Sequence, residues 1–216
     1  YHGITFDWSG KCTFVPSQGV IPGVYAIRAY RLVERGLWAW IWMGDDDKAD
    51  EALIPTLEEI GYGMAGYVAA PLSSRYVEGR YQLLNDNLLD LTHLGYLHGT
   101  SIGTQADAET PEVRDLNDRR LSSRRYMKNT PLPPSHRAAT GFDGMVDRLS
   151  GMDFFFPGFH AGISEASIAE GEAEAGRLLH SSRVWHAVTP AKKTSCNYFF
   201  AMSATEQGTL DRAKTS

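Results

Sequence analysis

One short apolar segment, residues 87–98, contains four side chains that could hold or serve a metal ion. These are Asn87, Asp90, His93 and His98. Imidazole is the commonest protein ligand of transition metals, and two histidines with one carboxylate suit a non-haem Fe(II) that keeps open positions for O2. The alternative is two ordinary histidines, one in the core and one at a helix end. The asparagine and aspartate at fixed offsets favour the metal site.

The spacing within this segment restricts its local structure. Asp90 and His93 are three residues apart and share a face if the segment is helical. His98 lies five residues beyond His93, about 140° further round an ideal helix. Both imidazoles can therefore reach one metal only if the helix ends or bends between them, and Gly95 and Gly99 permit such a break. The pattern of zinc hydrolases, with histidines four apart and a glutamate beside the first, is not present.

The elements that must position these side chains can be predicted from hydrophobic periodicity and turn residues. Residues 77–91 are predicted as a helix that leads into the metal motif. Residues 99–111 and 129–141 are rich in glycine, serine or proline and are predicted as loops. His136, in the second loop, has no partner motif, so no role is assigned to it. The rest of the chain is predicted as an antiparallel sheet with strands at 152–156, 159–168, 177–189 and 195–203.

Alternation along these strands predicts which side chains face a cavity. On this register Phe159, His160, Ile163, His186 and Tyr198 lie in or near it. His160 or His186 could bind an anionic group of an aromatic acid. Either could equally be a hydrogen-bonded histidine of the core.

The first 44 residues are predicted as β-structure, with strands at 24–30 and 37–43. Trp38, Trp40 and Trp42 alternate along the second strand and should share one buried face. Residues 45–57 are rich in acidic side chains and predict a solvated linker. The chain is accordingly divided into a domain at 1–46 and a domain at 47–216.

Two charged clusters admit a functional and a structural interpretation. The acidic run 45–51 could contact a redox partner, but an exposed connector is the favoured interpretation. Four arginines in the predicted strand at 113–127 could dock an acidic ferredoxin, although an exposed strand face is again favoured. They are Arg119, Arg120, Arg124 and Arg125.

Composition excludes several classes of protein. With 216 residues, 43% of them hydrophobic, the chain can bury a substantial core. The formal net charge of −5 argues against a nucleic-acid-binding protein. No apolar run approaches the roughly 20 residues that span a bilayer. Two distant cysteines, Cys12 and Cys196, do not make a disulfide framework and indicate a cytoplasmic protein.

Three motifs together resemble one enzyme family. The run Tyr1-His2-Gly3-Ile4-Thr5-Phe6-Asp7 resembles the end of the second ligand loop of a Rieske domain, and Trp40–Asp45 resembles the strand that closes such a domain. The Asn87–His98 motif resembles the mononuclear-iron motif of the same enzymes. The chain is therefore similar to the oxygenase component of Rieske non-haem iron oxygenases. The closest resemblance is to the vanillate O-demethylase and dicamba monooxygenase group, through residues 90–93 and 189–200.

The resemblance implies a fold and two metal centres. The expected fold is α+β, with the C-terminal part of a Rieske β domain followed by a helix-grip, START-like catalytic domain that has a curved antiparallel sheet. His93 and His98 would bind a mononuclear Fe(II), and the third ligand, a carboxylate, is expected after Ser216. His2 would be one ligand of a [2Fe–2S] Rieske cluster whose other ligands are expected before Tyr1. The chain thus resembles one that is truncated at both ends.

The resemblance also implies roles for the polar neighbours of the iron. Asp90 would accept a hydrogen bond from the second ring nitrogen of His93 and link it to a Rieske histidine of a neighbouring subunit. Asn87 would lie beside the iron or support this link. Such transfer between subunits implies a homotrimer, with electrons that come from NAD(P)H through a reductase or ferredoxin.

The implied reaction is the O2-dependent hydroxylation or O-demethylation of an aromatic compound, such as a vanillate-like acid. A ring-hydroxylating dioxygenase using the same iron site is the alternative within the family. A metal-free helix-grip module that binds an apolar ligand is the alternative of another class. Such a carrier would have no use for the polar residues at 87, 90, 93 and 98 inside its cavity.

Overall fold

The computed structural model describes residues 2–205. The chain separates into two compact units, of which the first ends at Ile54 and the second begins at Pro55. The predicted domain boundary, after residue 46, lies earlier, at the start of the acidic segment. Each unit is described by itself.

The first unit consists of two small hairpins and two short 3-10 helices. Strands β1 (Thr5–Phe6) and β2 (Cys12–Phe14) pair with each other, as do β3 (Leu32–Arg35) and β4 (Trp38–Ile41). The acidic segment forms η1 (Asp46–Lys48) and η2 (Glu51–Leu53). Its side chains are mostly exposed, and Lys48 pairs with Asp45 at 2.8 Å. The structure therefore agrees with the interpretation of this segment as a solvated connector.

The strand predicted at 24–30 is not formed. This stretch makes one isolated bridge, Lys11 to Ala26, and Tyr25 N–H donates to the Pro22 carbonyl oxygen at 3.0 Å. The segment pairs with residues 10–12 only around this bridge, where Cys12 N–H donates to Tyr25 and Ile27 N–H donates to Gly10, and alternation of side chains alone did not reveal how short this pairing is. The strand predicted at 37–43 is confirmed in part by β4. Trp38 is buried, whereas Trp40 is half-buried.

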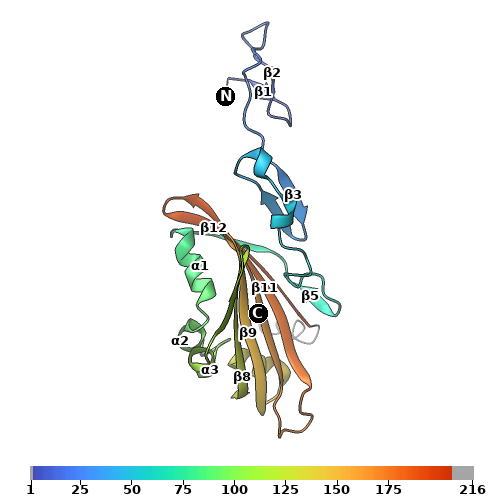
Figure 1. Cartoon of the computed structure of the whole chain (residues 1–216), viewed down its shortest axis with the longest axis vertical. Helices are drawn as coiled ribbons and strands as arrows, with labels where there is room; N and C mark the ends of the chain where they lie inside the picture. The colour runs from blue at the N-terminus through green and yellow to red at the C-terminus, as the bar shows by residue number, and fades with distance from the viewer. Residues whose placement is uncertain (1, 206–216) are drawn as a thin grey trace. The chain divides into compact units, whose positions relative to one another are not determined.

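The second unit is built on one antiparallel sheet of eight strands (Figure 1). Its order is β5-β12-β11-β10-β9-β8-β7, and β6 pairs with β12 beside β5. The strands are β5 (Tyr67–Ala69), β6 (Ser73–Val77), β7 (Val113–Leu116), β8 (Arg120–Pro131), β9 (Met145–Phe155), β10 (Phe159–Ile168), β11 (Leu178–Lys192) and β12 (Ser195–Thr205). From β8 to β12 each strand pairs with the next one along the chain. The predicted sheet is confirmed, although β9 begins seven residues before its predicted start because Met145 already pairs with Pro131.

Three helices lie together beside one face of this sheet (Figure 1). They are α1 (Tyr81–Leu89), α2 (His93–Leu97) and α3 (Gln105–Glu109). Helix α1 starts later than the predicted residue 77 because residues 73–77 form β6 instead. A fourth helix, α4 (Pro134–Thr140), follows β8.

Helices α3 and α4 lie in segments that were predicted as loops. Thr104 and Asp107 form a capping box at the start of α3. Helix α4 has proline in its first turn, and Gly141 ends it in the left-handed conformation, with φ of +66°. Both helices were therefore encoded by their caps, which the low hydrophobic periodicity of these short segments concealed.

The core of the second unit lies within and under the sheet. Trp185 is fully buried, and its indole N–H donates to the Ile60 carbonyl oxygen at 2.7 Å. A second buried cluster consists of Leu132, Val146 and Ala166, against which Phe142 and Leu179 pack. Long strands with alternate buried side chains therefore produce a mixed α+β fold dominated by one curved sheet.

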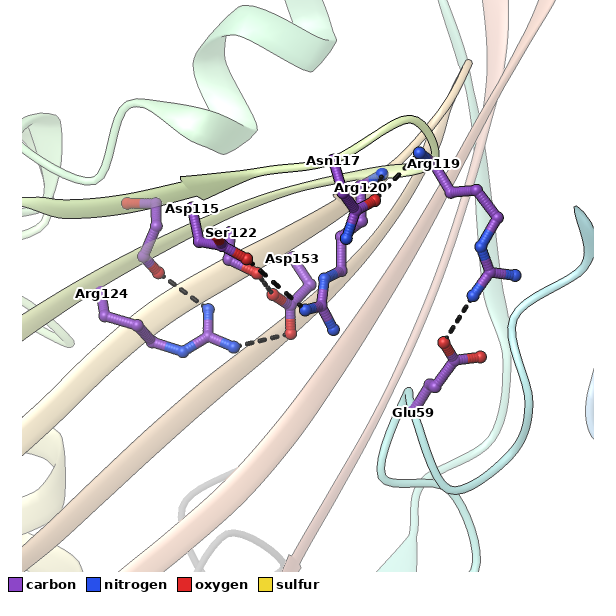
Figure 2. Close-up of polar contacts among 9 residues, drawn as sticks. Glu59, Asp115, Asn117, Arg119, Arg120, Ser122, Arg124 and Asp153 are labelled. Carbon is purple, nitrogen blue, oxygen red and sulfur yellow. Dashed lines mark hydrogen bonds and ion pairs between the residues drawn. The ribbon is translucent and has the colours of Figure 1, made fainter.

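The four arginines of the 113–127 region each lie near a carboxylate, and Figure 2 shows the pairs of Arg119, Arg120 and Arg124. Arg119 binds Glu59 at 2.7 Å, Arg124 binds Asp153 at 2.7 Å, Arg120 approaches Asp115 at 3.9 Å and Arg125 approaches Glu112 at 3.7 Å. Their charges are neutralised within the described chain, so these arginines do not make an open basic surface. Arg125 is buried and the other three arginines are half-buried, so the favoured interpretation, an exposed strand face, is wrong, and the ion pairs give the cluster a structural role.

Among residues 2–205 no helix has the length and apolar character that a membrane crossing requires. Cys12 and Cys196 are both buried free thiols.

Candidate active site

The metal motif lies at the junction of α1 and α2. Helix α1 ends at Leu89, Asp90 follows it with a non-helical backbone, and α2 begins at His93. Helix α2 ends at Leu97, so that His98 is the residue just beyond it. The helix thus ends between the two histidines, as their spacing required, and the imidazole centroids lie 5.3 Å apart.

Local hydrogen bonds fix the tautomer of His93. Its Nδ1 contacts the main-chain carbonyl oxygen of Asp90, which can only accept. Nδ1 therefore carries the proton, and Nε2 keeps the lone pair that a metal would need.

In this chain by itself the Asp90 carboxylate does not accept the bond from His93, and its role as a link to a neighbouring subunit stays a prediction. Asp90 Oδ1 accepts instead from the Thr92 amide at 3.0 Å and from the Thr92 hydroxyl. The hydroxyl bond is the main reason why the pKa of Asp90 lies below its usual 3.8, and the bond from the Thr92 amide and the nearby charge of Arg125 act in the same direction. Residues 91 and 92 form a tight turn before α2. In this turn the main-chain oxygen of Asp90, rather than its carboxylate, contacts Nδ1 of the His93 ring.

The two imidazoles suit a shared metal ion. Bonds from a metal to ring nitrogens are about 2 Å long, so two rings on one ion must lie within a few ångströms of each other, as these do. Among residues 2–205 no group of three or more His, Cys, Asp or Glu side chains gathers around a common point. The described residues therefore fit two ligands of a mononuclear iron.

A cavity of about 450 Å³ lies between this motif and the sheet. That volume is in the range of small-molecule sites. Its helical side includes Asn87, Leu88, Leu91, His93, Leu94 and His98. Its sheet side includes Arg148, Ser150, Met152, Gly162, Ile163, Ser164, Ser182, Val184, His186, Tyr198 and Met202, and His136 of α4 also lines it. The structure thus places Asn87, His93, His98 and His186 around one cavity.

His186 and Tyr198 form a polar pair on the sheet side of the cavity. A hydrogen bond of 2.6 Å joins His186 Nδ1 and the Tyr198 hydroxyl, and the rings stack with centroids 5.7 Å apart. Burial lowers the pKa of His186 to about 4 and raises the pKa of Tyr198 to about 12. Both side chains are therefore neutral near pH 7.

His160 is not among the residues that line the cavity. It shares a face of the sheet with its cross-strand partner His186, as the register predicted, but Asn85 of α1 covers it. Asn85 Oδ1 accepts from His160 Nε2 at 3.0 Å, and its amide donates to the Pro157 carbonyl oxygen at 3.1 Å. Burial lowers the pKa of His160 to about 3. Of its two alternatives, the structure agrees with the hydrogen-bonded core histidine.

A buried ion pair connects the helices to the sheet at the other end of the cavity. Arg148 of β9 donates to both carboxylate oxygens of Asp107, each at 3.1 Å, and to the Thr104 hydroxyl at 2.9 Å. Asp107 is fully buried and also accepts from the Thr104 amide at 2.8 Å. The first turn of α3 is therefore held directly on the sheet.

Helix α2 packs on this fixed turn through two glycines. A Cβ on Gly95 would lie 2.9 Å from the Thr104 carbonyl oxygen, and a Cβ on Gly103 would overlap the Leu94 carbonyl oxygen. The His98 carbonyl oxygen accepts from the Gly103 amide at 3.0 Å. The backbone contact that these glycines permit sets the position of His93 and His98 above the sheet.

On the solvent side of the motif, Asp90 borders a shallow depression of about 360 Å³. Its charged residues are Asp86, Asp90, Glu112, Arg114 and Arg125. The exposed carboxylate of Asp90 therefore faces away from the cavity that His93 and His98 line.

His2 lies in the first unit, exposed and just before β1. Cys12, the other residue of this unit with a side chain that Rieske clusters use, is buried in β2. Among residues 2–54, therefore, the side chains do not fit a complete cluster, and His2 stays a predicted ligand.

The sequence did not single out several residues that line the cavity. Arg148, Ser150, Ser164 and Ser182 carried no motif, and Tyr198 was placed near the cavity without a role. These residues occupy alternate positions on adjacent strands. Such positions identify cavity-lining side chains only when the pairing of the strands is known.

Comparison with known proteins finds a matching family model and relatives that are subunits of oxygenase systems. The family model of the vanillate O-demethylase oxygenase C-terminal domain matches residues 77–215. A vanillate O-demethylase oxygenase subunit of Pseudomonas sp. is 34% identical, covering 94% of this chain and 63% of that protein. A putative toluene-4-sulfonate monooxygenase system iron-sulfur subunit of Comamonas testosteroni is 31% identical, covering 94% of this chain and 60% of that protein.

A solved structure is similar over the whole chain. The crystal structure of dicamba monooxygenase bound to 3,6-dichlorosalicylic acid superposes with a TM-score of 0.84 and 25% identity, covering all of this chain and 63% of that one. The likeness confirms the predicted fold class. The chain thus spans less than two thirds of the length of these relatives.

Proposed function

The chain belongs to the vanillate O-demethylase oxygenase C-terminal domain family, and we propose on this basis that it forms the catalytic part of a Rieske-type oxygenase component. In this proposal His93 and His98 hold a mononuclear Fe(II), which supplies the activation of O2 when it is bound. The substrate is an aromatic compound, such as a vanillate-like acid, that is hydroxylated or O-demethylated in the cavity.

The residues of this chain would perform three tasks. His93 presents Nε2 to the metal because the Asp90 carbonyl oxygen holds its other ring nitrogen. Leu88, Leu91 and Leu94 give the helical side of the cavity an apolar surface that excludes water. Asn87 lines the same side and would position substrate or O2 beside the metal.

The observation that carries the proposal is the meeting of His93 and His98 at the wall of a cavity of ligand size. The test is the iron content and the electron paramagnetic resonance spectrum of the mononuclear site in the intact protein, beside His93→Ala and His98→Ala. Both variants should lose mononuclear iron. His160→Gln is the control, because His160 lies outside the cavity and should leave iron bound.

Two results would contradict the iron site. One is a parent protein that binds no iron, which would instead support a metal-free module that binds an apolar ligand. The other is a His93→Ala variant that keeps its full iron content. Product analysis then separates the two oxygenase reactions, because O-demethylation releases formaldehyde whereas ring dihydroxylation does not.

We also propose that electrons enter on the side of Asp90. They would come from NAD(P)H through a reductase or ferredoxin, and a Rieske cluster with His2 as one ligand would deliver them between subunits of a homotrimer. The exposure of Asp90 on the face away from the cavity supports this route. Asp90→Asn should keep its iron and its substrate binding but lose reductase-dependent oxygen uptake, and unchanged uptake would contradict the route.

A further inference from the structure

Arg125 of β8 is a buried arginine beside the metal motif. It is paired in register with Ser150, whose side chain lines the cavity, so both residues lie on the face of the sheet that the helices cover. Arg125 is 4% exposed and lines the depression that Asp90 borders. A buried positive charge therefore lies next to the α1–α2 junction, on the side where the proposed electron route enters.

The guanidinium of Arg125 lacks most of the partners that a buried arginine requires. Its Nε and Nη1 are buried and have no hydrogen bond among residues 2–205. Its Nη2 approaches Glu112 at 3.7 Å, which is beyond hydrogen-bond distance, and Glu112 is itself held by Arg114 at 2.7 Å. A buried donor without an acceptor destabilises a fold, so its presence in the core points to a function that retains it.

The Asp90 carboxylate has an oxygen that is available to accept such a bond. Its Oδ1 is taken by Thr92, whereas Oδ2 has no hydrogen bond within the part of the chain that the structure describes. Asp90 is exposed and follows α1 with a non-helical backbone. Arg125 is close enough for its charge to act on this carboxylate. Free donors and a free acceptor of opposite charge thus border one depression.

Covering the depression would strengthen the attraction between these two groups. While Asp90 is exposed, water screens its charge. A protein surface that excludes this water makes an unpaired carboxylate unfavourable and increases its attraction to a nearby guanidinium. Arg125 is already buried, so only Asp90 has to lose its hydration when the pair forms.

We propose that Arg125 is a positioning residue for electron entry, and that its free N–H groups hold the Asp90 carboxylate when a neighbouring subunit covers the depression. The inference rests on the proposed function and adds to it a residue outside the metal motif. Arg125 contacts neither the metal nor the substrate; it acts through Asp90, by restricting the carboxylate to one orientation. Asp86, which is exposed in the same depression, is the competing carboxylate.

The test is the rate at which a reduced Rieske cluster is reoxidised in a single turnover. The intact, iron-loaded protein is mixed with O2 and vanillate, and the cluster is followed by stopped-flow absorbance. A hydrogen bond to a charged group corresponds to a change of about 10-fold or more, so Arg125→Met should slow reoxidation by at least that factor. Arg125→Lys, which keeps the charge but not the planar fork, should restore part of the rate. Iron content and the binding of vanillate should be unchanged in both variants.

Stability separates a positioning role from a structural one. Arg125→Met removes buried donors that have no acceptor and leaves Glu112 with Arg114, so the free energy of unfolding should not fall. Arg124→Met is the matched control, because Arg124 is the preceding residue of β8, on the opposite face, and holds Asp153 at 2.7 Å. The control should lose stability and keep its rate of reoxidation. A structural role for Arg125 predicts lower stability with an unchanged rate.

The outcomes separate the inference from the function on which it rests. A parent that binds no mononuclear iron, or whose cluster stays reduced with vanillate and O2, contradicts both. If the parent transfers electrons, an Arg125→Met variant that is equally fast, or that is slowed only together with a loss of stability, overturns the inference alone. An Asp86→Asn variant that is slowed as much as Arg125→Met overturns it too. Slow reoxidation at retained stability, with no further slowing when Arg125→Met is added to Asp90→Asn, supports it.

Discussion

At the scale of single residues, the two buried histidines of the sheet have different surroundings. His160 is enclosed by Asn85 and stacks on Phe154, whereas His186 faces the cavity with Tyr198. Burial lowers the pKa of both, to about 3 for His160 and about 4 for His186. Each is thus neutral in the folded protein at pH values where it would be protonated in the unfolded chain.

The first prediction is a dependence of stability on pH that His160 causes. Because its folded pKa lies below the unfolded value of 6.5, its contribution is present above pH 6.5 and is lost as pH falls towards 3. Between those limits the free energy of unfolding should rise with pH by about 1.4 kcal/mol per pH unit for this one proton. His160→Gln should remove that part of the slope in urea unfolding between pH 4 and 6. Equal slopes for parent and variant would contradict it.

At the scale of elements, the metal motif is held by its neighbours rather than by its own length. Helix α2 covers only five residues, too few to be stable alone. It is fixed by backbone contact with α3, and α3 is fixed by the Arg148–Asp107 pair on β9. Changes in these contacts should therefore affect the metal site at a distance.

The second prediction concerns the contact between α2 and the turn before α3. Gly103→Ala places a methyl group against the Leu94 carbonyl oxygen and should lower the free energy of unfolding by about 1–3 kcal/mol. Gly79→Ala is the control, because an added Cβ there meets only Val77, at 3.7 Å. Chemical denaturation of both variants measures the difference. Equal stabilities would show that α2 moves to accept the methyl group.

The third prediction concerns the buried ion pair. Arg148→Met leaves the Asp107 carboxylate buried without its partner and should lower the free energy of unfolding by about 3–5 kcal/mol. The double variant Arg148→Met with Asp107→Leu should regain most of this stability, which chemical denaturation measures. The affinity for Fe(II) should stay about 10- to 100-fold weaker in the double variant because α3 is no longer held in place.

A matched control for the ion pair is available on the same sheet. Arg124 binds Asp153 at 2.7 Å, and Asp153 also accepts from the Ser122 hydroxyl, in a triad of the same chemistry (Figure 2). Arg124→Met should lower stability without changing the affinity for Fe(II). An equal loss of affinity in both arginine variants would refute a positioning role for Arg148.

At the scale of the whole molecule, the chain consists of two units of unequal character. The second unit has a continuous buried core under its sheet. In the first unit most large apolar side chains are exposed, among them Trp8, Phe14, Val24 and Ile27. The stability of the second unit should therefore depend little on the first.

The fourth prediction follows from this contrast. A protein of residues 55–216 should unfold in one cooperative transition, at a denaturant concentration close to that of the whole chain. Circular dichroism and tryptophan fluorescence, with Trp185 as the reporter, should give coincident curves. Non-coincident curves, or a much lower midpoint, would mean that the second unit needs the first.

The sequence predicted the parts of this structure that short motifs or strong periodicity encode. The break between His93 and His98, the antiparallel sheet and the fold class were predictable because each depends on local spacing or on long alternating runs. The short helices α3 and α4 were missed because a few capping residues encode them. The cavity-lining residues Ser150, Ser164 and Ser182 and the Arg148–Asp107 pair could not be predicted because they depend on which strands are neighbours and in which register.

The order of strands has a consequence for how the site is assembled. From β8 to β12 every strand pairs with its successor in the chain, so this part of the sheet closes only short loops and should form early in folding. Strands β5 and β6 must instead find β12 from the opposite end of the unit, which is a slower, non-local event. The segment that carries the histidines follows β6 directly in the chain. It should therefore dock on the sheet at the same late stage of folding as β6. The site is thus built from its substrate side towards its metal side, and the floor of the cavity exists before the two imidazoles converge above it.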